Sequence, residues 1–536
     1  MKPRNLTRLV AVLLAFLMLP AMGALAQSAE PFEFSATVIA WGGDDDASMV
    51  QQEWLRLMEE KMGRPIKVNY TRIPSSEYDE RARIMLNTDS MTDFMTTPLF
   101  HDVSREAEAG MLLDFSQYDM PNYQKFIEQT PAGESLAYNA EGKIYRLLEG
   151  ALPRFEADKG MLPNNMMVFN ATVFEENNIE IPSTLEGVVE AARKLKEIYP
   201  DSFPINTRWN NFNSVYLMHH VYNDIYWDGE VFRFGVFDEN YKKALQFLNM
   251  LYTDKLLDPE YSLETDDTVK SKLLNRKNFI GINEWFTAPG DYTRAAREST
   301  GDVFAVTLYP DTKEFGKSWQ SVQNVNSYDL SGWGQFIVDS NTKDPETLVK
   351  FLDLQYAPDV IELITWGIKD VTYTVDENGN RAFIDEIAKA DDPFTAGDKY
   401  GMRASAKHRP GLQMASDSSA YVAMARQDYV YYDGKVHEEP LEKSPYLTEL
   451  PYPNPDYMPA NFDAPKISFT VDQGAEAGQI LTPIATYRDE MFAKFVKGEE
   501  SFDNWDAYIE NIRKMGDIDK VLTMYNDAAQ AYLKQE

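Results

Sequence analysis

The sequence predicts an α/β protein built from more than one large folding unit. Short β-rich runs such as MMVFN, NFIGIN and GQFIVD alternate along the chain with amphipathic helical segments, which is the pattern of parallel sheets covered by helices. The chain has 536 residues, and this length exceeds that of an ordinary single domain. The sequence contains no internal repeat and no low-complexity linker. We therefore expect several domains or two large lobes.

The first 26 residues have the pattern of a secretory signal peptide. Lys2, Arg4 and Arg8 precede an unbroken apolar run over 9–19, and Ala24-Leu25-Ala26 has the small-x-small form of a cleavage site. Cleavage after this motif leaves about 510 residues. It also removes three positive charges, so the formal net charge goes from −33 to −36. We expect an exported protein, periplasmic or extracellular.

Composition excludes several classes of function. A strongly acidic surface should repel nucleic acid and anionic membranes, because binding phosphate requires clustered Lys and Arg. No later segment approaches the ~20 apolar residues that span a bilayer. The chain has no cysteine, which excludes disulfides, thiol catalysis, cysteine-based zinc sites and a lipid anchor on an N-terminal cysteine. Stability must then come from a large core, which this length can supply.

The chain after the signal peptide opens with a strand, a polar loop, a helix and a second strand. FSATVIAW ends at Trp41, GGDDDAS forms the loop, MVQQEWLRLMEEKMG is the helix and IKVNY is the next strand. Open α/β sheets bind ligands at the carboxyl ends of their strands. Trp41 and the loop acids Asp44, Asp45 and Asp46 are therefore candidate ligand-binding residues.

Further helices follow from capping and periodicity. Ser183-Thr184-Leu185-Glu186 has the form of a capping box that opens a helix with apolar residues on one face. Another helix is expected over about 241–255, and three more over 483–497, 503–515 and 517–533. Between the central and C-terminal helices, the acidic run 376–380 compares poorly with a calcium loop, because its glycine is fourth rather than sixth. Asn378-Gly379 fits a β-hairpin turn instead.

No sequence pattern identifies a catalytic site. The five histidines form no HExxH arrangement, and no G-x-S-x-G, P-loop or GxGxxG motif is present. A glycosidase needs only two carboxylates at the right separation. With 85 acidic residues, such a pair is not excluded, but nothing singles one out.

Several tryptophans lie beside polar loop residues. Besides Trp41, these are Trp209 in NTRWNN, Trp285 in NEW and Trp333 in SGWG. Flat aromatic faces pack against the apolar face of a sugar ring, and neighbouring Asp, Asn and Arg satisfy its hydroxyls. For each of these residues a core position is about as plausible as a ligand contact. Trp54 and Trp505 lie in helical apolar stripes and are expected in the core.

The mature chain contains, in this order, the segments VIAWGGDDDAS, EGKIYRL, MVFNATVFEENNIEIPSTLEG, DGEVFRF with YKKALQFLNMLYTDKLLDPE, WGIKDVTYTVDENGNRAF and FVKGEESFDNWDAYIENIRKMG. Taken together, these segments resemble the family 1 extracellular solute-binding proteins of carbohydrate ABC transporters, especially the aldouronate- and alginate-binding type. No single motif is decisive, but the resemblance covers essentially the whole mature chain.

Three features depart from the family pattern. NTDSMTDFMTTP stands where the family has an SGdlPDi segment, so the backbone there is expected to differ. Phe169 stands where many sugar-binding members have Tyr, which removes a hydroxyl. The lipid-attachment cysteine is missing, which favours a free periplasmic protein or an unusual mode of retention.

The resemblance implies a two-lobed periplasmic-binding-protein fold of type II, with a ligand cleft between the lobes. We expect crossovers near Gly150, Pro310 and Lys343. These divide the mature chain into an N-lobe of 27–149 plus 310–343 and a C-lobe of 150–309 plus 344–536. Hinge closure on the ligand is the expected mechanism.

Three groups of residues are expected to line the cleft. The resemblance implies that the loop from Trp41 to Asp46 supplies acids from the N-lobe, that Trp285 stacks from the C-lobe and that Phe169 lies nearby. Local composition adds Trp209 and Trp333. No cofactor, catalytic residue or metal is expected.

The function predicted is that of a non-enzymatic, monomeric receptor that delivers an oligosaccharide to an ABC permease. Two alternatives stay open: a secreted glycoside hydrolase or lyase, and a structural cell-surface protein. The acidic surface disfavours a polyanionic ligand. Arg403 and Arg409 could offset that locally, although surface charge is the more ordinary interpretation of this pair.

Overall fold

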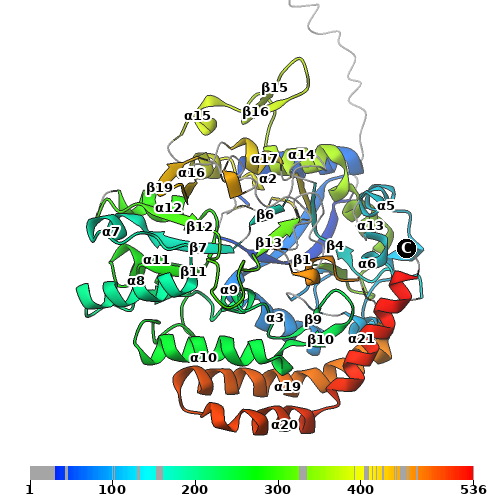
Figure 1. The fold of residues 1–536 in the computed structure, drawn as a ribbon. Helices are drawn as coiled ribbons and strands as arrows, with labels where there is room; N and C mark the ends of the chain where they lie inside the picture. The colour runs from blue at the N-terminus through cyan, green and yellow to red at the C-terminus, as the bar shows by residue number, and fades with distance from the viewer. Residues whose placement is uncertain are drawn as a thin grey trace, which may run out of the picture.

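Figure 1 shows the computed structural model of the protein, which describes residues 30–534 apart from short gaps. The gaps are 43–45, 99–100, 102, 130–132, 140, 153–160, 164, 298, 325–334, 391–392, 404–407, 409, 413, 418, 425–427, 440, 442–443, 447–455, 458, 466 and 468. The predicted signal peptide lies outside the described residues, as do Asp44, Asp45, Trp333 and Arg409. None of the helices described here is long and apolar enough to cross a membrane.

A five-stranded sheet forms the centre of the N-lobe, in the order β2-β1-β3-β14-β4. The strands are β1 Phe32–Ala40, β2 Ile66–Pro74, β3 Phe94–Thr96, β4 Leu147–Leu148 and β14 Gln335–Val338. β1 runs parallel to β2 and β3, whereas β14 is antiparallel to both β3 and β4. The strands predicted from FSATVIAW, IKVNY and GQFIVD are confirmed.

Helices cover both faces of this sheet. They are α2 Met49–Met62, α3 Ser75–Asn87, α4 Ser104–Glu108, α5 Pro121–Glu128, α6 Gly133–Ala137, α13 Pro345–Asp353 and α14 Pro358–Trp366. α2 begins at Ser48, whose side chain accepts a hydrogen bond from Gln51 N, and it ends at Gly63 in the left-handed conformation that glycine favours. Trp54 is fully buried, as its helical stripe predicts, and its Nε1 donates to Gln355 at 3.0 Å.

A six-stranded sheet forms the centre of the C-lobe, in the order β19-β18-β12-β7-β11-β8. Its strands are β7 Asn165–Asn170, β8 Ile205–Asn206, β11 Ile280–Trp285, β12 Phe304–Thr307, β18 Tyr429–Tyr432 and β19 Lys435–Glu438. β7 is antiparallel to both neighbours. This sheet is therefore mixed, unlike the parallel sheet that the alternation of elements predicts, because the chain enters β7 from the other lobe.

The C-lobe helices lie around this sheet and along one side of the molecule. They are α7 Ala171–Glu176, α8 Leu185–Ile198, α9 Asn213–Met218, α10 Glu239–Thr253, α11 Asp266–Leu274, α12 Ala288–Ala296, α19 Val471–Lys497, α20 Trp505–Met515 and α21 Ile518–Leu533. α10, α19 and α20 stack at the bottom of Figure 1. Trp505 is buried in the C-lobe core, as predicted.

Two predicted helix starts differ from the structure. α8 is capped by Thr184, which accepts from Gly187 N, rather than by Ser183 in a capping box. Glu186 accepts instead from Lys313 N at 3.1 Å. α19 begins at Val471, a full three turns before the predicted start, because Thr470 and Gln473 form a capping box there.

The hairpin predicted at Asn378-Gly379 is confirmed. β15 Tyr373–Val375 pairs with β16 Arg381–Phe383, and Asp376 accepts hydrogen bonds from the backbone of Asn378 and Asn380 at 2.8 Å. The hairpin projects at the top of Figure 1 with α15 Asp385–Ala388. The acidic side chain of this loop therefore stabilises a turn.

Short two-stranded pairings accompany the connections between the lobes. β5 Gly150–Leu152 pairs with β17 Ala415–Asp417, and β6 Met161–Pro163 pairs with β13 Val322–Asn324. Past the expected crossover at Pro310, Asp311 still exchanges backbone hydrogen bonds with Ser183 and Leu185. The chain therefore stays on the C-lobe beyond Pro310, and the passage to β14 follows β13.

The third boundary also differs from the one expected near Lys343. The side chains of α13 and α14 are buried in the same core as Phe34 and Trp54. Phe351 lies between these rings, with centroids 5.2 Å and 5.8 Å away. Residues 345–366 therefore pack on the N-lobe sheet, and the chain joins the C-lobe sheet again only at β18.

Phe351→Ala tests this placement. Removing a fully buried ring from the N-lobe core should lower the free energy of unfolding by about 3–5 kcal/mol, because it leaves a cavity. Urea denaturation followed by circular dichroism measures the change. Ile84→Ala on the exposed face of α3 is the control and should shift stability by no more than about 0.5 kcal/mol. A loss for Phe351→Ala as small as that of the control would contradict the assignment.

Candidate ligand site

Each sheet has an edge at which the chain passes from one lobe to the other, and these two edges face each other. β4 ends at Leu148 and leads through β5 and β6 into β7, so the amino end of β7 at Asn165 faces the N-lobe. β11 is antiparallel to β7 and pairs Trp285 with Asn165. β8 is parallel to β11, so the segment after Asn206 lies at this edge too. In the N-lobe, β1 runs in the direction of β4, which places Trp41 at the facing edge.

On the N-lobe edge, the structure describes one of the three predicted acids. Asp46 accepts a hydrogen bond from Arg72 at 2.6 Å, and the Arg72 guanidinium lies 4.0 Å from the Tyr70 ring centroid. The Asp46 side chain is mostly exposed. Trp41 is half-buried against the cluster that includes Ile39. This edge therefore presents an aromatic side chain and an acid that is already paired with a cation.

On the C-lobe edge, Trp209 and Trp285 come together on one arginine. The Arg208 guanidinium carbon lies 4.8 Å from the Trp209 ring centroid and 4.6 Å from that of Trp285. The two centroids cannot be farther apart than the sum of these distances, 9.4 Å. Cation–π attraction of this kind strengthens when the cation is desolvated, and Arg208 is buried. One cation thus fixes two aromatic side chains that are 76 positions apart in the chain.

Arg208 can be buried because its charge and its hydrogen bonds are satisfied. Its Nε donates to Asn283 O at 3.2 Å, and NH1 donates to Asp266 Oδ1 at 3.1 Å. The carboxylate of Glu284 lies 3.9 Å from Nε. A buried cation without such partners would be strongly destabilising.

The backbone at Trp209 is held in an unfavourable conformation. Trp209 and Asn210 have φ values of 54° and 53°, in the left-handed region that costs non-glycine residues about 1–2 kcal/mol each. Trp209 N donates to Glu264 O at 2.9 Å, which ties the turn to the segment before α11. Trp209 as a whole residue remains 51% exposed. Strain of this kind concentrates at functional sites, and here it presents an indole to solvent.

A lysine-centred acidic cluster anchors that same segment. Carboxylate oxygens of Asp258, Glu260 and Glu264 lie within 4.8 Å of one another. Lys272 Nζ lies 3.0 Å from Asp258 and 2.7 Å from Glu260, and it also contacts Glu264. The ammonium group stands where a metal ion would otherwise balance these acids. The cluster fixes the carbonyl that receives Trp209 N.

Glu284 is a buried acid behind the two tryptophans. It is fully buried, and Oε2 accepts a hydrogen bond from Tyr292 OH at 2.9 Å. Burial raises the pKa of Glu284 above its ordinary value, and the nearby Arg208 charge offsets only part of that rise. Asp266 is the acid that accepts a hydrogen bond from Arg208 directly.

Two predicted residues lie away from this edge cluster or in other roles. Phe169 is fully buried in the C-lobe core and packs edge-on against Phe174, with centroids 5.4 Å apart. It lines neither of the two pockets described below. Arg403 NH2 donates to Glu149 Oε1 at 3.2 Å, so its charge is also paired with an acid.

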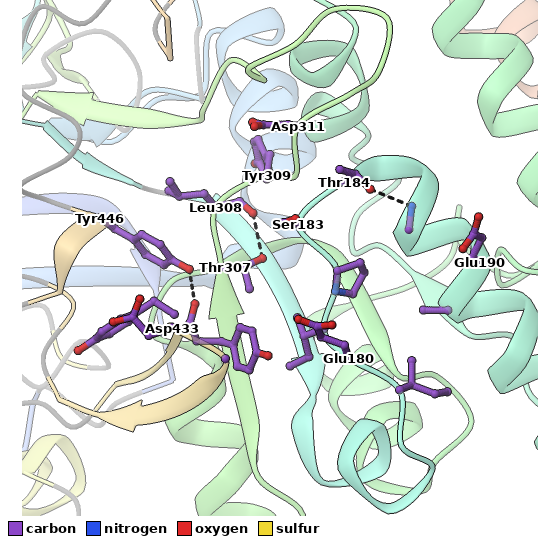
Figure 2. A pocket seen from close by; sticks show the side chains of 18 of the residues that line it. Glu180, Ser183, Thr184, Glu190, Thr307, Leu308, Tyr309, Asp311, Asp433 and Tyr446 are labelled. Carbon is purple, nitrogen blue, oxygen red and sulfur yellow. Dashed lines mark hydrogen bonds between the residues drawn. The ribbon is translucent and has the colours of Figure 1, made fainter.

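A large pocket of about 750 Å³ lies beside β12 and α8 (Figure 2). Its lining comes from the carboxyl end of β12, the turn between β18 and β19, and the segment that precedes α8. Five tyrosines contribute to it: Tyr309, Tyr431, Tyr432, Tyr446 and Tyr457. In Figure 2, Glu180 and Asp433 lie around the space, and Tyr446 OH donates to the Tyr431 carbonyl. Of the predicted site residues that the structure describes, none lines this pocket.

A smaller pocket of about 350 Å³ adjoins the edge cluster through Trp209. Its other walls come from the segment that leads into α9 and from α19. The lining is rich in asparagine and includes Arg488 and Asp489. The exposed indole of Trp209 thus belongs both to the edge cluster and to this pocket.

Sequence reasoning missed Arg208 and Asp266. Arg208 is next to Trp209 in NTRWNN, but its contact with Trp285 depends on the pairing of β8 with β11. Asp266 is an acidic residue at the start of α11, where an N-terminal acid is ordinary. The one sequence feature that could have indicated Arg208 was a cation within the Asn- and Trp-rich segment NTRWNN.

Glu284→Gln tests the buried acid. The variant keeps the shape of the side chain and its acceptor for Tyr292, but it cannot ionise. Because the pKa of Glu284 is raised in the fold, the wild-type carboxyl stabilises the protein below its ordinary pKa, and this contribution is lost as the pH rises. The melting temperature of the wild type should fall relative to that of the variant on going from mildly acidic to mildly alkaline buffer. Glu190→Gln on the exposed face of α8 is the control, and its melting temperature should change with pH as that of the wild type does. The same dependence of melting temperature on pH for Glu284→Gln and Glu190→Gln would contradict the account.

Comparison with solved structures places this fold among solute-binding proteins. The chain is similar to the alginate-binding protein AlgQ2 solved without calcium ion, with a TM-score of 0.71, 15% identity, and coverage of 94% of this chain and 98% of that one. FusA of S. pneumoniae in complex with kestose gives a TM-score of 0.68, 15% identity, and coverage of 94% and 100%. An HMO-binding, ABC-transporter-associated solute-binding protein from Bifidobacterium longum infantis gives a TM-score of 0.66 and 14% identity. That match covers 94% of this chain and 99% of the other. These likenesses confirm the two-lobed α/β fold.

Sequence comparison identifies the family. No curated protein matches the chain. The family model described as bacterial extracellular solute-binding protein matches residues 47–362, which is more than half of the chain and includes β7, Trp209 and Trp285. The chain therefore belongs to the bacterial extracellular solute-binding proteins.

Proposed function

We propose that this protein is the receptor of an ABC importer, which binds an oligosaccharide between its lobes and delivers it to a membrane permease. The observation that carries the proposal is the pair Trp209 and Trp285, held on Arg208 at the edge of the C-lobe that faces the N-lobe. Solved structures of similar fold include an alginate-binding protein, a complex with kestose and a milk-oligosaccharide-binding protein. Their ligand chemistry agrees with such a surface.

The two indoles suit a chain of sugars better than a single sugar. Arg208 lies against both rings, so the rings do not enclose one ligand between them. Each can take the apolar face of a different sugar in one chain, while Asp266, Asn210 and Asp46 satisfy hydroxyl groups. Trp41 and the loop that follows it are the counterpart on the N-lobe.

Closure of the lobes on the ligand is the proposed signal to the permease. A ligand that contacts both edges favours the closed form by its differential affinity for that form. No step requires a cofactor. The protein would act outside the cytoplasm, exported by its signal peptide and without a cysteine tether.

Binding without turnover is part of the proposal. The family is that of extracellular solute-binding proteins, and the carboxylates at the C-lobe edge already have partners within the protein. Asp266 pairs with Arg208, and Glu284 accepts from Tyr292. A pair of free carboxylates flanking the indoles, as a glycoside hydrolase requires, is not present at this edge among the described residues.

Trp285→Ala and Trp209→Ala test the proposal. Each should weaken binding of the preferred oligosaccharide at least about tenfold, equivalent to about 1.4 kcal/mol, because a stacked ring is lost. Trp285→Phe should retain more of the affinity than Trp285→Ala, since it keeps an aromatic face. Isothermal titration measures all three, after a glycan thermal-shift screen has identified the ligand.

The control is Trp227→Phe, which should leave the affinity unchanged. Trp227 lies in the small core formed where β9 Ile225–Trp227 pairs with β10 Phe232–Phe234. Unchanged titration of both Trp→Ala variants would remove these residues from the site. Release of shorter products during incubation with the bound oligosaccharide would contradict a receptor and favour an enzyme.

A further inference from the structure

The pocket beside Trp209 has the position of an extension to the proposed sugar surface. It lies between the segment that leads into α9 and the Arg488–Phe492 part of α19, and Trp209 forms one wall. Its volume of about 350 Å³ lies within the range of small-molecule pockets. Because Trp209 also contacts Arg208, a chain stacked on Trp285 and Trp209 reaches the mouth of this pocket with its next unit.

Amide side chains dominate the polar lining. Asn210, Asn211, Asn213 and Asn223 all contribute to it. Asn211 Oδ1 accepts from Asn213 N at 2.9 Å. Within the part of the chain that the structure describes, no hydrogen bond involves the side-chain amides of Asn213 or Asn223. An amide both donates and accepts, and a sugar hydroxyl does the same, so these groups match an uncharged polyol.

The cations around this surface are already matched by acids. Arg488 Nε lies 2.9 Å from Asp489 Oδ1, and NH1 lies 3.0 Å from Asp224 Oδ2. Arg208 is paired with Asp266 in the same way. Among the described residues of the pocket and the edge cluster, each arginine therefore has a carboxylate partner. The carboxylate of a uronate would meet no surplus positive charge and would lie near several acids.

The floor of the pocket adds neutral groups. Tyr216 and Tyr241 line it and are buried. Burial raises the pKa of both phenols well above the ordinary value, so they stay protonated at physiological pH. The strained backbone of Trp209 and Asn210 holds the indole at the mouth above this floor.

We propose that the Asn-lined pocket beside Trp209 is a further subsite that takes an uncharged sugar residue at the end of the bound chain. The proposal rests on the proposed function and narrows its ligand to neutral oligosaccharides of at least three units: one on Trp285, one on Trp209 and one in the pocket. Oligouronates are excluded because the arginines at this surface are already neutralised by Asp266, Asp224 and Asp489.

The test uses graded sets of neutral oligosaccharides, from disaccharide to octasaccharide, and of oligouronates of the same lengths. The full mature protein is titrated with each set, as wild type and as the double variant Asn213→Ala/Asn223→Ala. The double variant should lose about tenfold in affinity, or about 1.4 kcal/mol, for the longest neutral chains that bind, and nothing for a chain one unit too short to enter the pocket. Asn378→Ala on the projecting β15–β16 turn is the control. It should change neither the affinity for the longest neutral chains nor that for the shorter chain.

The outcomes separate this subsite from the proposed function. Equal losses for the shorter and longer chains, no loss for either, or tighter binding of the oligouronates overturns the subsite while leaving an oligosaccharide receptor in place. Failure of the wild-type protein to bind any glycan of either set overturns the proposed function, and the subsite with it. An affinity for the neutral chain that is insensitive to ionic strength supports the proposal, because paired charges contribute little attraction of their own.

Discussion

The contact on which the candidate site depends is that of a buried guanidinium with two indoles. Arg208 is removed from water, which is strongly unfavourable unless its charge is matched, and Asp266 and the carbonyl of Asn283 supply that match. Once Arg208 is fixed, the rings of Trp209 and Trp285 are fixed with it. A ligand bound at this proposed surface would meet side chains that are already ordered, so little side-chain freedom would be lost on binding.

The surroundings keep this arrangement in place. The ion cluster around Lys272 holds the segment that ends at Glu264, and the Glu264 carbonyl receives Trp209 N. That bond helps to offset the left-handed backbone of Trp209 and Asn210. A lysine therefore takes part in presenting the indole, although it lies behind the surface that a ligand would touch.

Much of the fold could be predicted from periodicity and turn chemistry, whereas the assignment of segments to lobes could not. The helices after Lys343 have ordinary apolar faces, and only the three-dimensional structure shows that they cover the N-lobe sheet. Phe169 is a similar case: it alternates with Val168 along β7, and periodicity cannot tell which face of a buried strand points toward a ligand. Trp209 and Trp285 were visible as loop aromatics, but Arg208, which joins them, depends on a contact between distant segments.

A crystal structure of the mature protein with its tightest-binding oligosaccharide would test the central claim most directly. The account predicts lobes closed on a neutral chain, with successive sugar faces on Trp285 and Trp209 and the terminal unit among the asparagines beside α9. A chain bound instead in the tyrosine-lined pocket beside β12 and α8 (Figure 2), with both indoles uncovered, would contradict it.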